Sequence, residues 1–355
     1  MSSPSSTEPN EMWRVIQRHQ VFQKPFPSTN FKPPDCTRIV CISDTHGRHR
    51  NLSVLPPGDI LIHAGDFTLR GELSIVQDVG DYFGKLSESF SEIIAIAGNH
   101  DKILHREYYL SKVKRSSAEK EVEEASRVIR QNCAYLQDSG YQTSTGLHVY
   151  GSPWTPEYCG WAFMLDRDVI GEKWRQIPSA TDILITHGPP LGRGDYVDMA
   201  GNVGCCELLK EIQQRIKPRV SIFGHVHEGY GATFDGHTLY VNASSVDLHY
   251  VPNRHAIVID VPHDPSKPAM VVPPSRCDMK VEDLVELCET NGWSALQHSL
   301  TGCDWTWLRQ TLPDNFSLAG DNAFSLLSRR LQLDHQGQME LLQALTIAYA
   351  GCFPP

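Results

Sequence analysis

The stretch Thr37-Arg38-Ile39-Val40-Cys41-Ile42-Ser43-Asp44-Thr45-His46 decides how we read the rest of this 355-residue chain. Its first part is a short run of β-branched and other apolar residues, which is typical of a buried strand. The run ends abruptly in polar side chains, beginning at Ser43. Polar residues directly after a buried strand are typical of α/β proteins, in which the chemistry gathers on loops beyond the carboxyl ends of strands.

The same pattern recurs along the chain. Four similar runs lie at 60–63, 93–97, 183–186 and 220–223, and each continues into a cluster of His, Asp, Asn and Gly. Helical patterns lie between them at 72–86, 118–131 and 205–216. The repetition of strand, polar loop and helix predicts an α/β fold. Segments 232–234, 237–241 and 255–259 look like strands linked without helices, so we expect the sheets to be mixed (α+β) rather than purely parallel.

Length and proline distribution predict how the chain is divided. At 355 residues it exceeds the usual size of one compact core. We expect residues 1–36, rich in Ser and Pro, to form an extended N-terminal arm, and 37–262 to form the main domain. Prolines crowded between Pro262 and Pro274 predict a stiff linker over 263–276. The apolar spacing of 277–355 predicts an added all-helical segment, which either docks on the main domain or binds a protein partner.

Charge and hydropathy exclude several classes of partner. The formal net charge of −10 argues against a surface that grips a nucleic-acid polymer. No apolar run approaches the roughly 18–20 residues needed to cross a bilayer, so no membrane association is expected. The first residues resemble neither a secretory leader nor a myristoylation signal, which predicts a cytoplasmic location. The ten cysteines are expected to be free thiols.

Five short motifs carry the candidate chemistry. In order they are Asp44-Thr45-His46, Gly65-Asp66, Gly98-Asn99-His100-Asp101, His187-Gly188 and Gly224-His225-Val226-His227. Without His100 and Asp101, they supply two carboxylates, one amide oxygen and four imidazoles. That set suits two divalent ions, and it is too rich in oxygen and too poor in thiolate for a structural zinc site.

The ordered set resembles the calcineurin-like metallophosphoesterase superfamily, whose pattern is D-x-H, G-D, G-N-H-D/E, H and G-H-x-H. A narrower similarity is to the animal metallophosphoesterase-domain-containing (brain 239-type) proteins. It rests on stretches such as Gly151-Ser152-Pro153-Trp154-Thr155-Pro156, Thr186-His187-Gly188-Pro189-Pro190 and His227-Glu228-Gly229-Tyr230-Gly231, and it covers 37–262. The resemblance implies that 37–262 is a four-layer αββα metallophosphoesterase sandwich, and it does not extend to 277–355.

The resemblance also implies a role for each motif. Asp44, His46 and His227 would bind a first metal ion, Asn99, His187 and His225 would bind a second, and Asp66 would bridge the two. His100 would protonate the leaving alkoxide, and Asp101 would orient or tune its imidazole. Some vertebrate relatives carry glycine at the position of His225, so this chain is expected to keep both sites. The two divalent ions could be manganese, iron, zinc or magnesium.

The resemblance further implies a metal-dependent phosphodiesterase that cleaves phosphodiester or cyclic nucleotide bonds by attack of a metal-bridging hydroxide on a small phosphoester or nucleotide. A phosphomonoesterase is one alternative, and a weakly active nucleotide-binding adaptor with a C-terminal interaction module is another. Arg48 either reaches a substrate phosphate or is a solvated loop residue. Tyr230 either stacks on a base or packs against the domain, as do Trp154 and Trp161. His63 is expected either to contact the metal ligands without binding metal itself or to pack in the core.

Overall fold

Strand β2 (Cys36–Ile42) is the fourth strand of a seven-stranded sheet, and this central position explains why its sequence is mostly apolar. The strand order is β1-β17-β16-β2-β3-β4-β5, with β3 at Ile60–His63, β4 at Glu92–Ala95 and β5 at Ala134–Tyr135. Strands β2 to β5 are parallel, whereas β16 (Ile257–Pro262) runs antiparallel to β2. Every residue of β2 is buried, because both faces of this sheet are covered.

A second sheet has six strands in the order β14-β15-β13-β10-β7-β6. Its four inner strands are parallel: β7 (His148–Ser152), β10 (Ile183–Thr186), β13 (Val220–Phe223) and β15 (Leu239–Asn242). The edge strands β6 (Ser139–Gln142) and β14 (Gly231–Phe234) are antiparallel to their neighbours. Both sheets are therefore mixed, as the sequence predicts.

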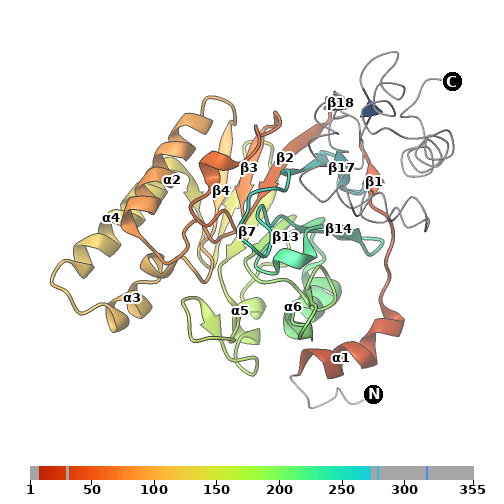
Figure 1. Cartoon of the computed structure of the whole chain (residues 1–355). Coiled ribbons are helices and arrows are strands. Elements are labelled where there is room, and N and C mark those ends of the chain that lie inside the picture. The colour runs from red at the N-terminus through yellow and green to blue at the C-terminus, as the bar shows by residue number, and fades with distance from the viewer. Residues whose placement is uncertain (1–7, 29–31, 273–277, 280–316, 319–355) are drawn as a thin grey trace, which may run out of the picture. The chain divides into compact units, whose positions relative to one another are not determined.

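The two sheets pack against each other and helices cover their outer faces (Figure 1). Residues of β2 alternate between two cores, with Ile39 and Cys41 facing the second sheet and Val40 and Ile42 facing the helices. The outer face of the first sheet packs on α2 (Leu73–Leu86) and α4 (Ala118–Asn132), and that of the second on α5 (Gly171–Arg175) and α6 (Cys206–Glu211). The helix predicted over 205–216 ends instead in a π-helical turn, η4 (Ile212–Ile216).

Shorter elements complete the first of the two compact units into which the chain divides, Met1–Val272. They are α1 (Pro9–Ile16), η1 (Gln17–His19), β1 (Phe26–Pro27), η2 (His49–Asn51), η3 (Lys102–Leu104), α3 (Arg106–Lys112), β8 (Thr155–Pro156), β9 (Met164–Leu165), β11 (Tyr196–Val197), β12 (Gly201–Asn202), η5 (His227–Gly229) and β17 (Met270–Val272). Among the described residues, no helix has the length and hydropathy of a membrane-spanning segment.

The structure is a computed structural model in which residues 8–28, 32–272, 278–279 and 317–318 are described. In the second unit, Pro273–Pro355, strands β18 (Asp278–Met279) and β19 (Ser317–Leu318) pair in parallel. The remainder of the helical segment expected over 277–355 lies outside the described residues.

The N-terminal arm differs from the extended conformation expected for 1–36. Residues Pro9–Ile16 form helix α1, with Pro9 at the first helical positions, where the missing N–H costs nothing. The side chain of Asn10 fixes this helix to the main domain: its Nδ2 donates to the carbonyl of Ala200 (2.8 Å) and its Oδ1 accepts from the backbone N–H of Asn202 (2.9 Å). The arm is thus part of the first unit.

The proline-rich range 263–276, expected to be a linker, also contributes to the sheet. Strand β17 pairs with β16 and with β1, so the backbone groups of Met270–Val272 are used in hydrogen bonds. The short apolar run at these three residues accounts for the pairing, because it can bury a side-chain face that the neighbouring prolines cannot. The boundary of the first unit therefore falls at Val272.

Candidate metal centre

The predicted ligands lie on loops that leave the carboxyl ends of strands in both sheets. Asp44 and His46 follow β2, Asp66 follows β3, Asn99 and His100 follow β4, His187 follows β10, and His225 and His227 follow β13. Because these strands are parallel within each sheet and the sheets pack face to face, the loops meet at one edge of the sandwich. The tertiary structure thus brings together residues separated by up to 183 positions.

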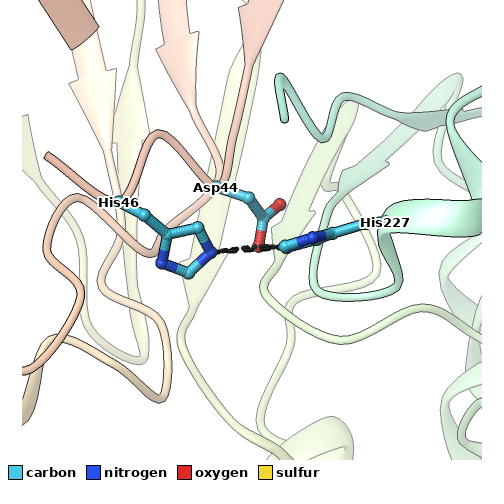
Figure 2. A group of neighbouring side chains, drawn as sticks. All are labelled: Asp44, His46 and His227. Atoms are coloured by element: carbon cyan, nitrogen blue, oxygen red, sulfur yellow. Dashed lines mark hydrogen bonds and ion pairs between the residues drawn. The ribbon is translucent and has the colours of Figure 1, made fainter. Parts of the chain in front are cut away.

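The first group is Asp44, His46 and His227, shown in Figure 2. The Nε2 atom of His46 lies 4.0 Å from Asp44 Oδ1, and that of His227 lies 3.6 Å from the same oxygen. The two Nε2 atoms are 3.3 Å apart. Donor atoms of all three residues therefore face one small volume, as expected for the first metal site.

Asp66 occupies the position between this group and the second set of predicted ligands. Its Oδ2 lies 3.8 Å from His46 Nε2 and 3.3 Å from His187 Nε2. His187 Nε2 is in turn 2.9 Å from Asn99 Oδ1. Asp66 belongs to two groups of converging donors, one with Asp44 and His187 and one with His46 and His100. This central placement suits a carboxylate that bridges two ions.

His225 is placed differently from the other predicted ligands. Its ring centroid lies 5.0 Å from that of His187, but His225 is not a member of the three groups of converging donors. Its backbone N–H donates to both carboxylate oxygens of Asp44, at 3.1 and 3.0 Å. His225 therefore holds a first-site ligand through its backbone while its imidazole lies on the side of His187.

Backbone hydrogen bonds fix the orientation of four imidazoles. The Nδ1 atoms of His46, His187, His227 and His100 lie 3.1, 3.0, 3.1 and 2.6 Å from the backbone carbonyls of Thr68, Ala64, Asp247 and Leu69, respectively. A carbonyl can only accept, so each Nδ1 carries a proton and each Nε2 of a neutral ring keeps its lone pair. Such outer hydrogen bonds are the usual way in which proteins aim histidines at a metal.

The backbone at the site has an unusual conformation. Four residues of the site have backbone φ values in the left-handed region, which residues other than glycine seldom adopt: 52° at Asp44, 44° at His46, 58° at Asp66 and 68° at His225. Residues in such conformations cost free energy and concentrate at functional sites. Gly98 and Gly224 are needed for a different reason: a Cβ there would collide with the carboxylates of Asp66 and Asp44.

The electrostatics of the site favour cations. Asp44 and Asp66 are almost completely buried, and among the described residues their ion-pair partners are all histidines. Burial acts to raise the pKa of Asp66, but the facing imidazoles outweigh it and hold the pKa below the usual range. Burial acts to lower the pKa of His187, but the carboxylate of Asp66 raises it to about 9. Two ionised carboxylates that face imidazole nitrogens, with no Lys or Arg ion-pair partner among the described residues, fit divalent cations well.

For two other imidazoles, the effect of burial on the pKa is larger than that of the nearby carboxylates. It lowers the pKa of His46 to about 4 and that of His225 to about 3, and the nearby carboxylates offset only part of the effect. Both rings are therefore neutral at physiological pH, which is the form that binds a metal.

His100 lies at the edge of the cluster. Its Nε2 is 4.0 Å from Asp66 Oδ2, and its ring contacts those of His46 and Trp161, with centroids 4.6 and 4.3 Å away. With Nδ1 bound to the carbonyl of Leu69, Nε2 is the atom that is free to exchange a proton.

The carboxylate of Asp101 forms no hydrogen bond with the imidazole of His100 among the described residues. The structure therefore shows no direct orientation of His100 by Asp101, and the tuning role that the resemblance implies stays a prediction. Its carboxylate accepts from the backbone N–H groups of Phe67, Thr68 and Gly98, at 3.1, 2.8 and 2.9 Å, and from the hydroxyl of Thr68. The carbonyl of Leu69 orients the imidazole instead. Asp101 thus joins two loops, because its carboxylate accepts hydrogen bonds both from the loop after β3 and from its own loop after β4.

Neither of the two predicted substrate contacts is committed to the cluster. The side chain of Arg48 is exposed and forms no hydrogen bond or ion pair with the described residues. The hydroxyl of Tyr230 donates to the carbonyl of His255 (2.8 Å), and the guanidinium of Arg254 lies over its ring. Tyr230 therefore packs against the domain, which is one of the two roles expected for it from the sequence.

Two contributors to the site were missed from the sequence. The hydroxyl of Ser244 donates to Asp44 Oδ2 (2.9 Å), and Ser244 follows the parallel strand β15, so the rule used for the other loops would have found it. The ring of Tyr250 lies 4.8 Å from that of His46, although no local pattern marks it. His63, by contrast, supports the site as expected: its Nε2 lies 3.0 Å from Thr45 Oγ1 and its Nδ1 accepts from the N–H of Gly65 (3.3 Å).

Comparison with known proteins matches the model of the calcineurin-like phosphoesterase family to residues 37–229. The human and mouse proteins named metallophosphoesterase domain-containing protein 1 are each 44% identical over 254 residues, which span 69% of this chain and 77% of theirs. A Caenorhabditis elegans protein, UPF0046 protein C25E10.12, is 35% identical over 273 residues, or 74% of this chain and 96% of its own. The range 37–229 that the family model matches includes all five motifs of the candidate centre.

Proposed function

The chain belongs to the calcineurin-like phosphoesterase family, and on that premise we propose that it is a dinuclear phosphodiesterase acting on phosphodiester or cyclic nucleotide bonds. The observation that carries the proposal is the convergence of Asp44, Asp66, His46, His187 and His227 on one buried volume. Divalent cations best compensate these buried carboxylates and imidazole nitrogens, which have no Lys or Arg ion-pair partner in the described part of the chain.

The predicted ligands divide between two positions. Asp44, His46 and His227 would hold one ion, Asn99, His187 and His225 would hold the other, and Asp66 would contact both. When bound, two such ions supply an activated water and neutralise negative charge on the phosphoryl oxygens. The metal could be manganese, iron, zinc or magnesium, because all four accept this mixture of oxygen and imidazole ligands.

The protein's own contribution is to position groups and to move a proton. The carbonyls of Thr68, Ala64 and Asp247 aim three imidazoles before any ligand arrives, so little reorganisation is needed on binding. His100 would donate a proton from Nε2 to the leaving oxygen, and this atom lies 4.0 Å from the carboxylate of Asp66. Diester substrates need such a donor because an alkoxide is a poor leaving group.

Hydrolysis of two chromogenic esters tests the proposal. The protein is assayed with added manganese on bis(p-nitrophenyl) phosphate and on p-nitrophenyl phosphate, before and after treatment with EDTA. We expect turnover of the diester that EDTA abolishes and manganese restores. Release of phosphate from the monoester alone would favour a phosphomonoesterase. Binding of a nucleotide without turnover of either ester would favour an adaptor.

The variant Asp66→Asn sharpens the test, because it removes the carboxylate that both groups share. We expect it to lose bound metal and turnover together, by at least about a hundredfold in rate. Its matched control is Asp81→Asn, which changes an exposed aspartate of α2 and should leave both quantities unaltered. Wild-type turnover in Asp66→Asn would contradict the proposal.

A further inference from the structure

Tyr250 has a ring that lies against two of the predicted metal ligands. Its centroid is 4.8 Å from that of His46 and 5.6 Å from that of His227, and both pairs are edge-on. The side chain is 37% exposed, so one part of the ring faces the imidazoles and another part faces solvent. An exposed aromatic surface at the mouth of a site is available to a ligand.

The loop that carries Tyr250 is held rigidly. One carboxylate oxygen of Asp247 accepts from the N–H groups of His249 (2.8 Å) and Val251 (3.0 Å), and the other accepts from Asn253 Nδ2 (2.7 Å). The carbonyl of the same Asp247 orients His227. One residue thus fixes both a metal ligand and the neighbouring aromatic loop.

Tyr250 does not stabilise the fold in the way that a packed tyrosine does. Its φ of 59° is unfavourable for a bulky side chain, and its hydroxyl has no hydrogen-bond partner in the part of the chain that the structure describes. Tyr230 shows the contrast, because its hydroxyl is bound to the carbonyl of His255. A strained, partly exposed aromatic residue beside a catalytic cluster is more economically explained by a ligand contact than by packing.

The position of Tyr250 relative to His100 indicates which part of a substrate it meets. The ring of His46 contacts that of His100 at 4.6 Å and that of Tyr250 at 4.8 Å, whereas no ring contact joins His100 and Tyr250 among the described residues. His100, on the leaving-group side, contacts Trp161 instead. Tyr250 is therefore placed for the ester group that stays on phosphorus. Leu248 and Val251 on the same loop are 55% and 49% exposed, so the loop presents further apolar side chains to solvent.

We propose that the ring of Tyr250 is a specificity-determining contact that favours diesters whose retained ester group is planar and aromatic, such as an aryl or nucleoside group. The inference rests on the proposed phosphodiesterase function and adds the chemical class of its substrate. Stacking of one aromatic group on a side chain is commonly worth about a tenfold change in an equilibrium or rate constant.

Two esters with the same leaving group test the inference. Bis(p-nitrophenyl) phosphate retains an aryl group on phosphorus, whereas methyl p-nitrophenyl phosphate retains a methyl group. For Tyr250→Leu we expect kcat/KM to fall roughly tenfold on the first ester and less than about twofold on the second. Tyr250→Phe, which keeps the ring, should behave as wild type on both.

Binding provides a readout that does not depend on turnover. Inhibition by diphenyl phosphate should weaken roughly tenfold in Tyr250→Leu, while inhibition by dimethyl phosphate should not change. The control is Tyr158→Leu, which removes a tyrosine that is 87% exposed and has no ring contact with a described aromatic or histidine side chain.

Equal losses on both esters in Tyr250→Leu, or loss of bound metal in that variant, would show a structural role and overturn the inference. Unchanged selectivity would also overturn it. A wild-type protein that hydrolyses neither ester would instead contradict the proposed function, so the two failures are distinguishable.

Discussion

The Nε2 atoms of His46 and His227 lie 3.3 Å apart, although the Nδ1 proton of each ring is already committed to a backbone carbonyl. In the neutral rings two lone pairs therefore face each other, which is unfavourable unless a cation lies between them. Asp44, 3.6 Å from His227 Nε2, adds a negative charge to the same volume. The fold thus maintains an arrangement that a metal ion would stabilise.

Adding metal should therefore raise the stability of the protein. At a free manganese concentration about a hundredfold above Kd, the free energy of unfolding should increase by about 2.7 kcal/mol per site. Thermal unfolding followed with and without EDTA measures the effect. His46→Ala should reduce the shift, whereas His148→Ala, at an exposed histidine on β7, should not. An equal shift in both variants would contradict the assignment.

His100→Ala should slow catalysis while sparing the metal centre. We expect kcat on the diester to fall by roughly 10²–10⁴, because the leaving oxygen loses its proton donor. Metal content, measured by mass spectrometry, should stay at the wild-type level. The loss should also be smaller on an ester with a more acidic leaving group, which needs less protonation. Loss of metal along with activity would assign His100 a ligand role.

Asp101→Asn should act through the two loops that the carboxylate joins and not through His100. The amide cannot accept as well from the N–H groups of Phe67, Thr68 and Gly98, so we expect about 1–3 kcal/mol less stability in urea. The pH at which activity rises and falls should not move. A displaced pH profile with unchanged stability would support the tuning role.

His63 should make the metal-free protein sensitive to acid. Burial lowers the pKa of this ring to about 3, against about 6.5 in the unfolded chain. The unfolded state therefore binds more protons between these values, and the stability present above pH 6.5 is lost as the pH falls toward 3. Between pH 7 and 5 the free energy of unfolding should fall by about 2 kcal/mol on this account.

Urea unfolding of wild type and His63→Gln at the two pH values measures this contribution. The variant is less stable at pH 7, because the bonds to Thr45 and Gly65 are altered, but its stability should depend less on pH. The same pH dependence in both proteins would show that His63 does not remain neutral in the fold.

His225→Gly should separate metal binding from folding. Because His225 has a φ of 68°, glycine adopts this backbone conformation without strain, and the N–H that donates to Asp44 remains. We expect stability of the metal-free protein within about 1 kcal/mol of wild type and weaker binding at one of two sites. Titration by calorimetry that still shows two wild-type sites would contradict the predicted role of this imidazole.

The sequence predicted the strands that position the site, because their apolar runs are long enough to be buried on both faces and end in polar residues. It did not predict helix α1, since the evidence for an ordered arm lies in the contacts of Asn10 with a hairpin some 190 residues away. It also misplaced the end of the first unit, because the three apolar residues of β17 are too few to form a recognisable strand pattern.

The sequence by itself determined which residues gather at the candidate centre. Parallel strands of one sheet deliver the loops at their carboxyl ends to one edge, so a motif after each strand is enough to place Asp44 near Asp66, and the resemblance to the metallophosphoesterase pattern adds His187, which follows a strand of the second sheet. Only the tertiary structure decided how those side chains point and what surrounds them: the carbonyls that fix the imidazoles, the turn that Asp101 closes, and the ring of Tyr250 beside His46. The physical reason is that a strand pattern repeats every two residues and depends only on residues that are neighbours in the sequence. Hydrogen bonds and ring contacts, in contrast, depend on distances between segments far apart in the chain.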